Sequence, residues 1–228
     1  YSEGVAFLRF EVDELDNVNF PTEGHWGFVD YGWHRDAFGD DGSFDQLAYG
    51  ADIVLTWDRL TVRPGISGGT SLNGTAPVSR LFELGGFLRL SGLERNELSG
   101  EDYLLVRTVV YRRINKSEFL PVYFGGSVEY GSIGDDVDLQ DGKAAGSLFL
   151  GVDSVIGPIY IGGGWAEGYY VNYWLYEWLF FCEVARTCEG VDYYAMAPAF
   201  FRNRAVASMF EIFVFGLLGE FLFLVEVT

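Results

Sequence analysis

Stretches in which apolar and polar residues alternate constrain the fold of this chain more than any other feature. In ADIVLTWD, Ala51, Ile53, Leu55 and Trp57 face one side of an extended chain, and the residues between them face the other. The same alternation predicts nine strands, at residues 5–12, 24–35, 46–57, 60–72, 103–114, 119–132, 144–154, 157–166 and 169–180. Several exceed the ~5–6 residues usual in soluble proteins and match the ~9–11 residues that cross a bilayer at a tilt.

The connections between these strands also alternate in length. Short turns (NFPTE, DR, NKSE and SVI) alternate along the chain with longer acidic loops (DAFGDDGSFD and GDDVDLQDG), as in a transmembrane β-barrel. Aromatic residues near strand ends, such as Trp26 and Trp33, fit the girdles found at membrane interfaces. A soluble β-sandwich is the alternative, because it shows the same alternation. Strand length, loop asymmetry and a mean hydropathy of +0.13 favour an all-β, antiparallel transmembrane barrel.

Composition narrows the range of partners. An aromatic content of 18% with 30 glycines fits sheet better than helix. The net charge of -18 excludes nucleic acid, because nothing in the chain would neutralise a run of phosphates. The acids gather in Gly-rich loops without EF-hand spacing, so we expect no metal and no cofactor. Cys182 and Cys188 leave two options open, one local disulfide or two free thiols. The chain opens on a strand-like stretch, so either a leader was removed or this is a fragment.

Patterns typical of catalysis are weak, and we expect no catalytic residues. GISGG around Ser67 matches G-x-S-x-G, but that motif needs a strand before it and a helix after it. Pro64 precedes it and TSLNGTAP, a poor helix, follows. His25 and His34 flank one predicted strand without a third zinc ligand. Charged residues of the strands are instead expected to line a barrel interior and pair with acids of an inserted loop: Arg107, Arg112, Arg113 and Glu129.

Several ordered motifs resemble the Omp85 (bacterial surface antigen, D15) family of outer-membrane β-barrels. FELGGFLRLSGL is similar to the family's F-x-L-G-G…R-G-[YF] segment, which lies in a long loop folded back into the barrel lumen. NFPTEG is similar to its F-P-T-x-G turn, and LFLGVDSVIGPIYIGGGWAEG resembles its closing strand pair. YWLYEWLF resembles the C-terminal strand that the barrel-assembly machinery reads.

The resemblance covers about residues 5–180 and implies structural roles for two sets of residues. The lumen-loop set is Phe82, Leu84, Gly85, Gly86, Ser91 and Gly92. The turn and closing-strand set is Phe20, Pro21, Thr22, Gly24, Gly151, Asp153, Gly157, Pro158 and Phe180. In a loop packed inside a barrel, glycines allow close backbone approach and free φ.

Two departures from the family pattern refine this expectation. Where its assembly factors and two-partner secretion pores carry an arginine, this chain has Ser91. LSGL, and GVD around Asp153, instead resemble the subgroup whose barrel follows a patatin-like phospholipase domain. Family barrels have about sixteen strands. The resemblance therefore implies that residues 1–180 are the C-terminal portion of a barrel, either incomplete or closed by a tail, residues 181–228, that supplies extra strands or an extension.

The function implied by the resemblance is that of a bacterial outer-membrane anchor, not an enzyme. It would hold, and translocate or display, an upstream patatin-like lipase domain. Its partners would be outer-membrane lipids and lipopolysaccharide, the barrel-assembly machinery and that passenger domain, with the oligomeric state left open. The alternatives are a passive outer-membrane pore, an Omp85-type assembly or translocation factor, and a soluble esterase that uses Ser67.

Overall fold

The computed structural model describes residues 5–35, 43–117, 120–154, 157–166 and 169–176. Contacts divide the chain into residues 1–179 and 180–228, and all described residues lie in the first unit. Phe180, Cys182, Cys188 and the expected tail lie outside the described residues. Apart from one turn of 3-10 helix at Val78–Arg80, the regular structure described is β-strand.

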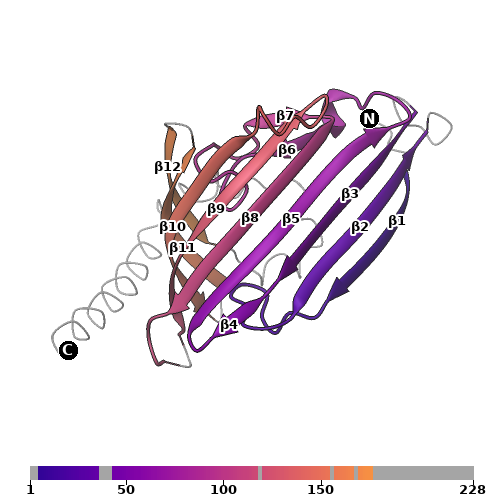
Figure 1. Cartoon of the computed structure of the whole chain (residues 1–228). Coiled ribbons are helices and arrows are strands. Elements are labelled where there is room, and N and C mark those ends of the chain that lie inside the picture. The colour runs from indigo at the N-terminus through magenta and orange to yellow at the C-terminus, as the bar shows by residue number, and fades with distance from the viewer. Residues whose placement is uncertain (1–4, 36–42, 118–119, 155–156, 167–168, 177–228) are drawn as a thin grey trace, which may run out of the picture. The chain divides into compact units, whose positions relative to one another are not determined.

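One large antiparallel sheet contains most of these strands (Figure 1). Its order is β1-β2-β3-β5-β8-β9-β10-β11-β12, so strands that follow one another in the chain are neighbours in the sheet. The bounds are β1 (Val5–Asp13), β2 (His25–His34), β3 (Phe44–Ile53), β5 (Leu60–Leu72), β8 (Asp102–Arg113), β9 (Val122–Gly134), β10 (Lys143–Ser154), β11 (Gly157–Ala166) and β12 (Tyr169–Tyr176). The short β4 (Leu55–Trp57) also pairs with β5, and β6 (Phe82–Leu84) pairs with β7 (Leu98–Gly100) in a separate two-stranded sheet.

The strands expected from alternation are confirmed within the described residues, with two differences. The stretch 46–57 divides into β3 and β4 at Val54. The Val54 N–H donates, at 3.1 Å, to the carbonyl of Gly24 in the turn between β1 and β2. The connection between β5 and β8 carries its own short hairpin, β6 with β7, which the glycine-interrupted sequence did not predict.

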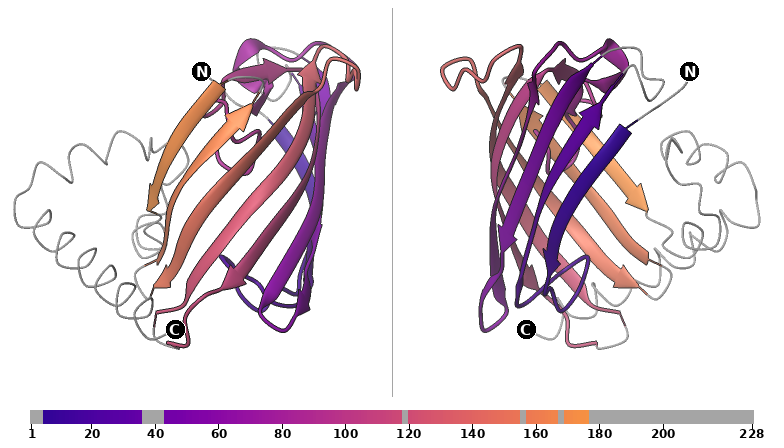
Figure 2. Two further views of the ribbon diagram at one scale, coloured as in Figure 1. Left: turned by 60° about the vertical axis from the view of Figure 1, so that its left-hand side comes forward. Right: turned by 90° about the vertical axis from the view of Figure 1, so that its right-hand side faces the viewer.

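The sheet is strongly curved (Figure 2), and its two faces differ in chemistry. Register places Val106 opposite Tyr130 and Val110 opposite Gly126, on the face we call the outer face. Exposed apolar side chains cover it, including Val128, which is 72% exposed, and Leu148, which is 56% exposed. From β1 to β11 the charged residues of this face lie only near strand ends: Asp45, Asp102 and Arg112.

The opposite, inner face carries the charged residues of the strand centres. One row of directly opposed residues crosses six strands on this face: Asp52, Gly65, Arg107, Glu129, Ala145 and Ala166. Arg9 and Asp30 lie opposite each other on the same face of β1 and β2. Within the described residues β1 and β12 each pair with one neighbour only, so a large antiparallel sheet is shown and its closure into a barrel is not.

Candidate functional site

Residues 81–101, in the connection between β5 and β8, fold over the inner face and contact it extensively. We call this segment the inner loop. Its tip is a tight turn in which the Gly85 N–H donates to the Arg89 carbonyl and the Arg89 N–H donates to the Gly86 carbonyl, each at 3.0 Å. Gly85 and Gly86 have φ of +129° and +106°, which side chains disfavour. This turn directs the next residues down onto the strands.

Glu129 of β9 fixes the inner loop. Its side chain accepts the N–H groups of Leu90, at 2.5 Å, and Ser91, at 2.8 Å. It also accepts the hydroxyl of Ser91, at 2.6 Å, and that of Ser127 on its own strand. Glu129 is 1% exposed, and hydrogen bonds to a charged acceptor are stronger than neutral ones. A buried carboxylate is costly unless it is paired in this way, so the loop and Glu129 depend on each other.

A second buried acid, Asp52 of β3, lies in the same row. Asp52 is 2% exposed, and its Oδ2 accepts from Arg63, at 2.6 Å, and Arg107, at 3.0 Å. The other guanidinium nitrogen of Arg107 donates to the Leu88 carbonyl of the inner loop, at 3.1 Å. Arg107 therefore links the strand ion pairs to the loop. Asp52 is nearly inaccessible to water, and two arginines pair with it, as a buried carboxylate requires.

The far side of the inner loop touches the backbone of β11. A Cβ added to Gly92 would lie 1.9 Å from the Ala166 nitrogen, and one added to Gly164 would lie 1.9 Å from the Ser91 carbonyl oxygen. Any side chain at either position would force the two backbones apart. Apolar side chains seal the contact, since Leu84 and Leu90, each 0% exposed, pack with Leu105 of the sheet.

The turn at residues 14–24, between β1 and β2, fills the inner face from the opposite end. Phe20 is 2% exposed and stacks on Tyr123, with ring centroids 4.1 Å apart. A Cβ on Gly151 would lie 2.3 Å from the Phe20 ring, so β10 accommodates the ring there. Phe20 and the inner-loop residue Phe87 each lie 5.3 Å from the ring of Tyr160. The two connections therefore meet on one aromatic group.

Polar contacts hold this turn in place. Asn17 and Asn19 donate to the two carboxylate oxygens of Asp153, at 3.0 and 3.3 Å, across the inner face. Within the turn Asp16 accepts the Thr22 hydroxyl, at 2.6 Å, and the backbone N–H groups of Thr22 and Glu23. Partial burial raises the pKa of Asp16, but these hydrogen bonds together outweigh it and leave the pKa below its usual value.

The motif residues identified in the sequence thus fall into two contacts. Gly85, Gly86, Ser91 and Gly92 form the inner loop and its seat, together with the β6 residues Phe82 and Leu84. Phe20 lies against Gly151, and its neighbour Asn19 donates to Asp153, so these distant parts of the chain meet on the inner face. The remaining motif residues have structural positions in turns and strand starts: Pro21, whose carbonyl accepts the Tyr111 hydroxyl, Thr22, Gly24, Gly157 and Pro158.

The residues considered for catalysis, metal binding and the barrel interior lie as follows. Ser67 lies inside β5, which continues to Leu72, so no helix follows it and the strand–helix turn of a hydrolase nucleophile is not formed. His25 and His34 lie at opposite ends of β2. No group of three potential metal ligands occurs among the described residues. Arg112 was expected to face inward, and this is wrong, because it lies opposite Phe124 on the outer face.

Trp26 was expected in an outer aromatic girdle, but it lies on the inner face. It pairs with Asp52 in the inner row and donates from Nε1 to Glu11, at 3.0 Å. Arg107 and Glu129 do bind the inner loop, but through its main chain and Ser91 rather than through loop acids. The sequence analysis missed Asp52 as the buried partner of two arginines. The signal available was a lone acid among apolar residues at an inward position.

The fold and this contact define an all-β protein with a large antiparallel sheet, apolar on one face and covered by its own loop on the other. A scan against protein-family models finds no match, and a search of curated proteins finds none either. In the part of the chain that the structure describes, no helix has the length and apolarity needed to cross a bilayer.

Proposed function

We propose that the chain is part of an outer-membrane β-barrel of the Omp85 type that anchors, and exports or displays, an upstream patatin-like lipase domain. The observation that carries this proposal is the separation of the two faces. An apolar face with few charges points outward, while ion pairs and a folded loop occupy the inner face. A soluble sheet protein would bury its apolar face instead.

The height of the apolar face fits a membrane. On β8 the outer residues run from Leu104 to Arg112 with only uncharged residues between them. At ~3.3 Å per residue this is about 26 Å along the strand. A strand tilt of ~35–45° reduces it to roughly 20 Å, close to the ~25 Å apolar band of transmembrane barrels. Exposed apolar patches of this extent are rare on soluble monomers.

The covered inner face favours an anchor over a passive pore. The inner loop and the turn at 14–24 enter from opposite ends and meet at Tyr160. An interior filled in this way leaves little room for a steady aqueous channel. Lipids and lipopolysaccharide would contact the outer face, and the barrel-assembly machinery would read the segment YWLYEWLF.

The test is to fold the full chain into detergent and lipid vesicles and compare its migration on SDS gels with and without boiling. We expect a sheet spectrum by circular dichroism, a boil-dependent shift, and low conductance in planar bilayers. A steady open channel would favour the passive pore. A water-soluble protein without a shift would refute the membrane assignment.

The anchoring role needs a separate experiment. The chain would be expressed with a secretion signal and an N-terminal epitope in a Gram-negative host. We expect the epitope in the outer-membrane fraction, and recovery in the periplasm or cytoplasm would contradict the anchor.

A further inference from the structure

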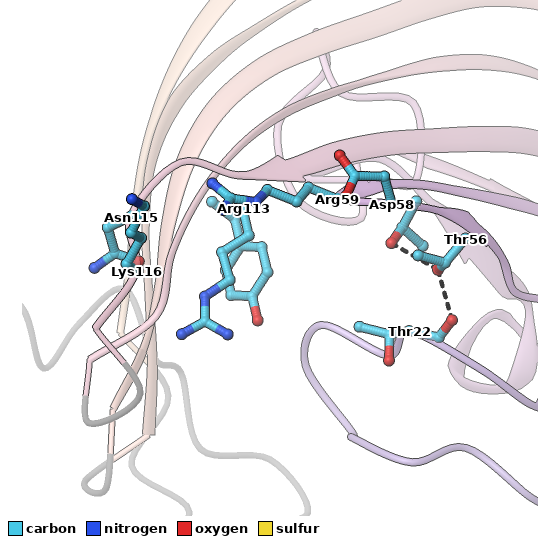
Figure 3. A pocket seen from close by; sticks show the side chains of 9 residues that line it. Thr22, Thr56, Asp58, Arg59, Arg113, Asn115 and Lys116 are labelled. Atoms are coloured by element: carbon cyan, nitrogen blue, oxygen red, sulfur yellow. Dashed lines mark hydrogen bonds between the residues drawn. The ribbon is translucent and has the colours of Figure 1, made fainter. Parts of the chain in front are cut away.

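A pocket of about 390 Å³ opens at one end of the sheet, where the turns β1–β2, β4–β5 and β8–β9 lie (Figure 3). The inner loop is at the opposite end. The walls of the pocket come from the turn at 14–24, the turn between β4 and β5, and the turn between β8 and β9. Among the described residues, three cations line it, Arg59, Arg113 and Lys116, with a single acid, Asp58. This is unusual in a chain that has 15 basic and 33 acidic residues.

The three cations differ from four other arginines of the described residues. Each of these four lies within 3.0 Å of a carboxylate: Arg9, Arg35, Arg63 and Arg107. Among the described residues, none of the three pocket cations has an acid within ion-pair distance. None of the three is held in an ion pair within the described part of the chain, so their positive charge is available to attract an anion to the pocket.

Arg113 also has an unused donor. One of its terminal nitrogens donates to the Ser117 carbonyl, at 2.5 Å, but Nε is buried with no hydrogen-bond partner in the structure. A buried donor without an acceptor costs ~1–3 kcal/mol. The donor that a bound oxyanion can reach is the other terminal nitrogen of Arg113, which is not enclosed and makes no hydrogen bond within the described residues.

The walls of the pocket are held in shape before any ligand binds. The Thr56 hydroxyl donates to the Thr22 carbonyl, at 2.5 Å, and lies 2.9 Å from the Thr61 hydroxyl. Asn115 closes the other turn, since its amide donates to the Leu120 carbonyl, at 2.7 Å, and accepts from the Val122 N–H, at 2.9 Å. Such prior ordering lowers the entropic cost of binding.

We propose that this pocket binds a phosphoryl group, as free phosphate or as the phosphate of a lipid headgroup. Two guanidinium groups and an ammonium supply more donors than a carboxylate can accept, and guanidinium forks suit phosphate oxygens. The excess of cations over acids among the described lining residues also favours an anion over a neutral ligand. The pocket is formed by three turns and does not depend on whether the sheet lies in a membrane.

The test is calorimetric titration of the full chain, folded in a phosphate-free maltoside detergent, with inorganic phosphate and separately with short-chain phosphatidic acid. We expect saturable binding of one or both probes, and the probe that binds identifies the source of the phosphoryl group. Lys116→Gln and Arg113→Gln should each weaken binding by about tenfold. Arg112→Gln, which removes the same charge from the outer face of the same strand, should leave it unchanged.

Two results would overturn the proposal: no saturable binding of either probe, or equal weakening by Arg112→Gln. Lys116 is exposed, so its variant folds as the native chain does and reports on the pocket alone. Circular dichroism and gel migration of the same samples report separately on the membrane proposal.

Discussion

Removal of the Glu129 side chain tests whether one buried carboxylate holds the inner loop. In Glu129→Ala the N–H groups of Leu90 and Ser91 lose their acceptor inside the protein. Each unpaired buried donor costs ~1–3 kcal/mol, and the loop can lift and reach water to limit the sum. We therefore expect the free energy of unfolding to fall by about 2–4 kcal/mol.

Glu129→Gln separates charge from hydrogen-bonding shape. Its amide oxygen can still accept the two N–H groups, while its NH₂ can donate to the hydroxyls of Ser91 and Ser127, which rotate to accept. Only the charge assistance is lost, so we expect a fall of about 1 kcal/mol. Glu83→Ala, at an exposed position of the same connection, is the matched control and should change stability by less than about 0.5 kcal/mol.

Guanidinium unfolding followed by tryptophan fluorescence measures these differences. Trypsin cleavage after Arg89 and Arg95 reports directly on whether the loop has left the sheet. If Glu129→Ala unfolded like the native chain and its loop were cut no faster, the carboxylate would not be the anchor.

Three further perturbations test other parts of the structure. Val128→Lys, on the outer face, should destabilise the chain in vesicles by about 2–4 kcal/mol if that face meets lipid, and an effect below about 0.5 kcal/mol would indicate water instead. Gly92→Ala should cost about 1–3 kcal/mol and speed loop proteolysis, whereas Gly134→Ala, where the nearest atom is 3.4 Å away, should not. Because the pKa of Asp16 is lowered on folding, its contribution to stability is complete above its unfolded pKa of ~3.9 and is lost as the pH falls through the folded value. Asp16→Asn should flatten this acid dependence of unfolding, and an unchanged pH profile would contradict the assigned hydrogen bonds.

The strands could be predicted from the sequence because side-chain alternation is a local property. Alternation in β8 and β9 correctly separated Leu104, Val106 and Val110 from Arg107, and Val128 from Glu129. It could not predict that the extended stretch 46–57 breaks at Val54, because the cause is a hydrogen bond to Gly24 in a distant turn.

For the part of the chain that the structure describes, the sequence by itself determined the positions and order of the long strands, the chemical difference between their faces, and the unusual character of the glycine-rich inner loop. Only the tertiary structure decided what each inward charge contacts. Glu129 binds main-chain N–H groups, which every residue but proline carries, so no side-chain pattern could reveal its partners. Asp52 joins Arg63 and Arg107 through the register of three strands, and Phe20 meets Gly151 across the curved sheet. These contacts depend on strand register and sheet curvature, which are set by the packing of the whole sheet.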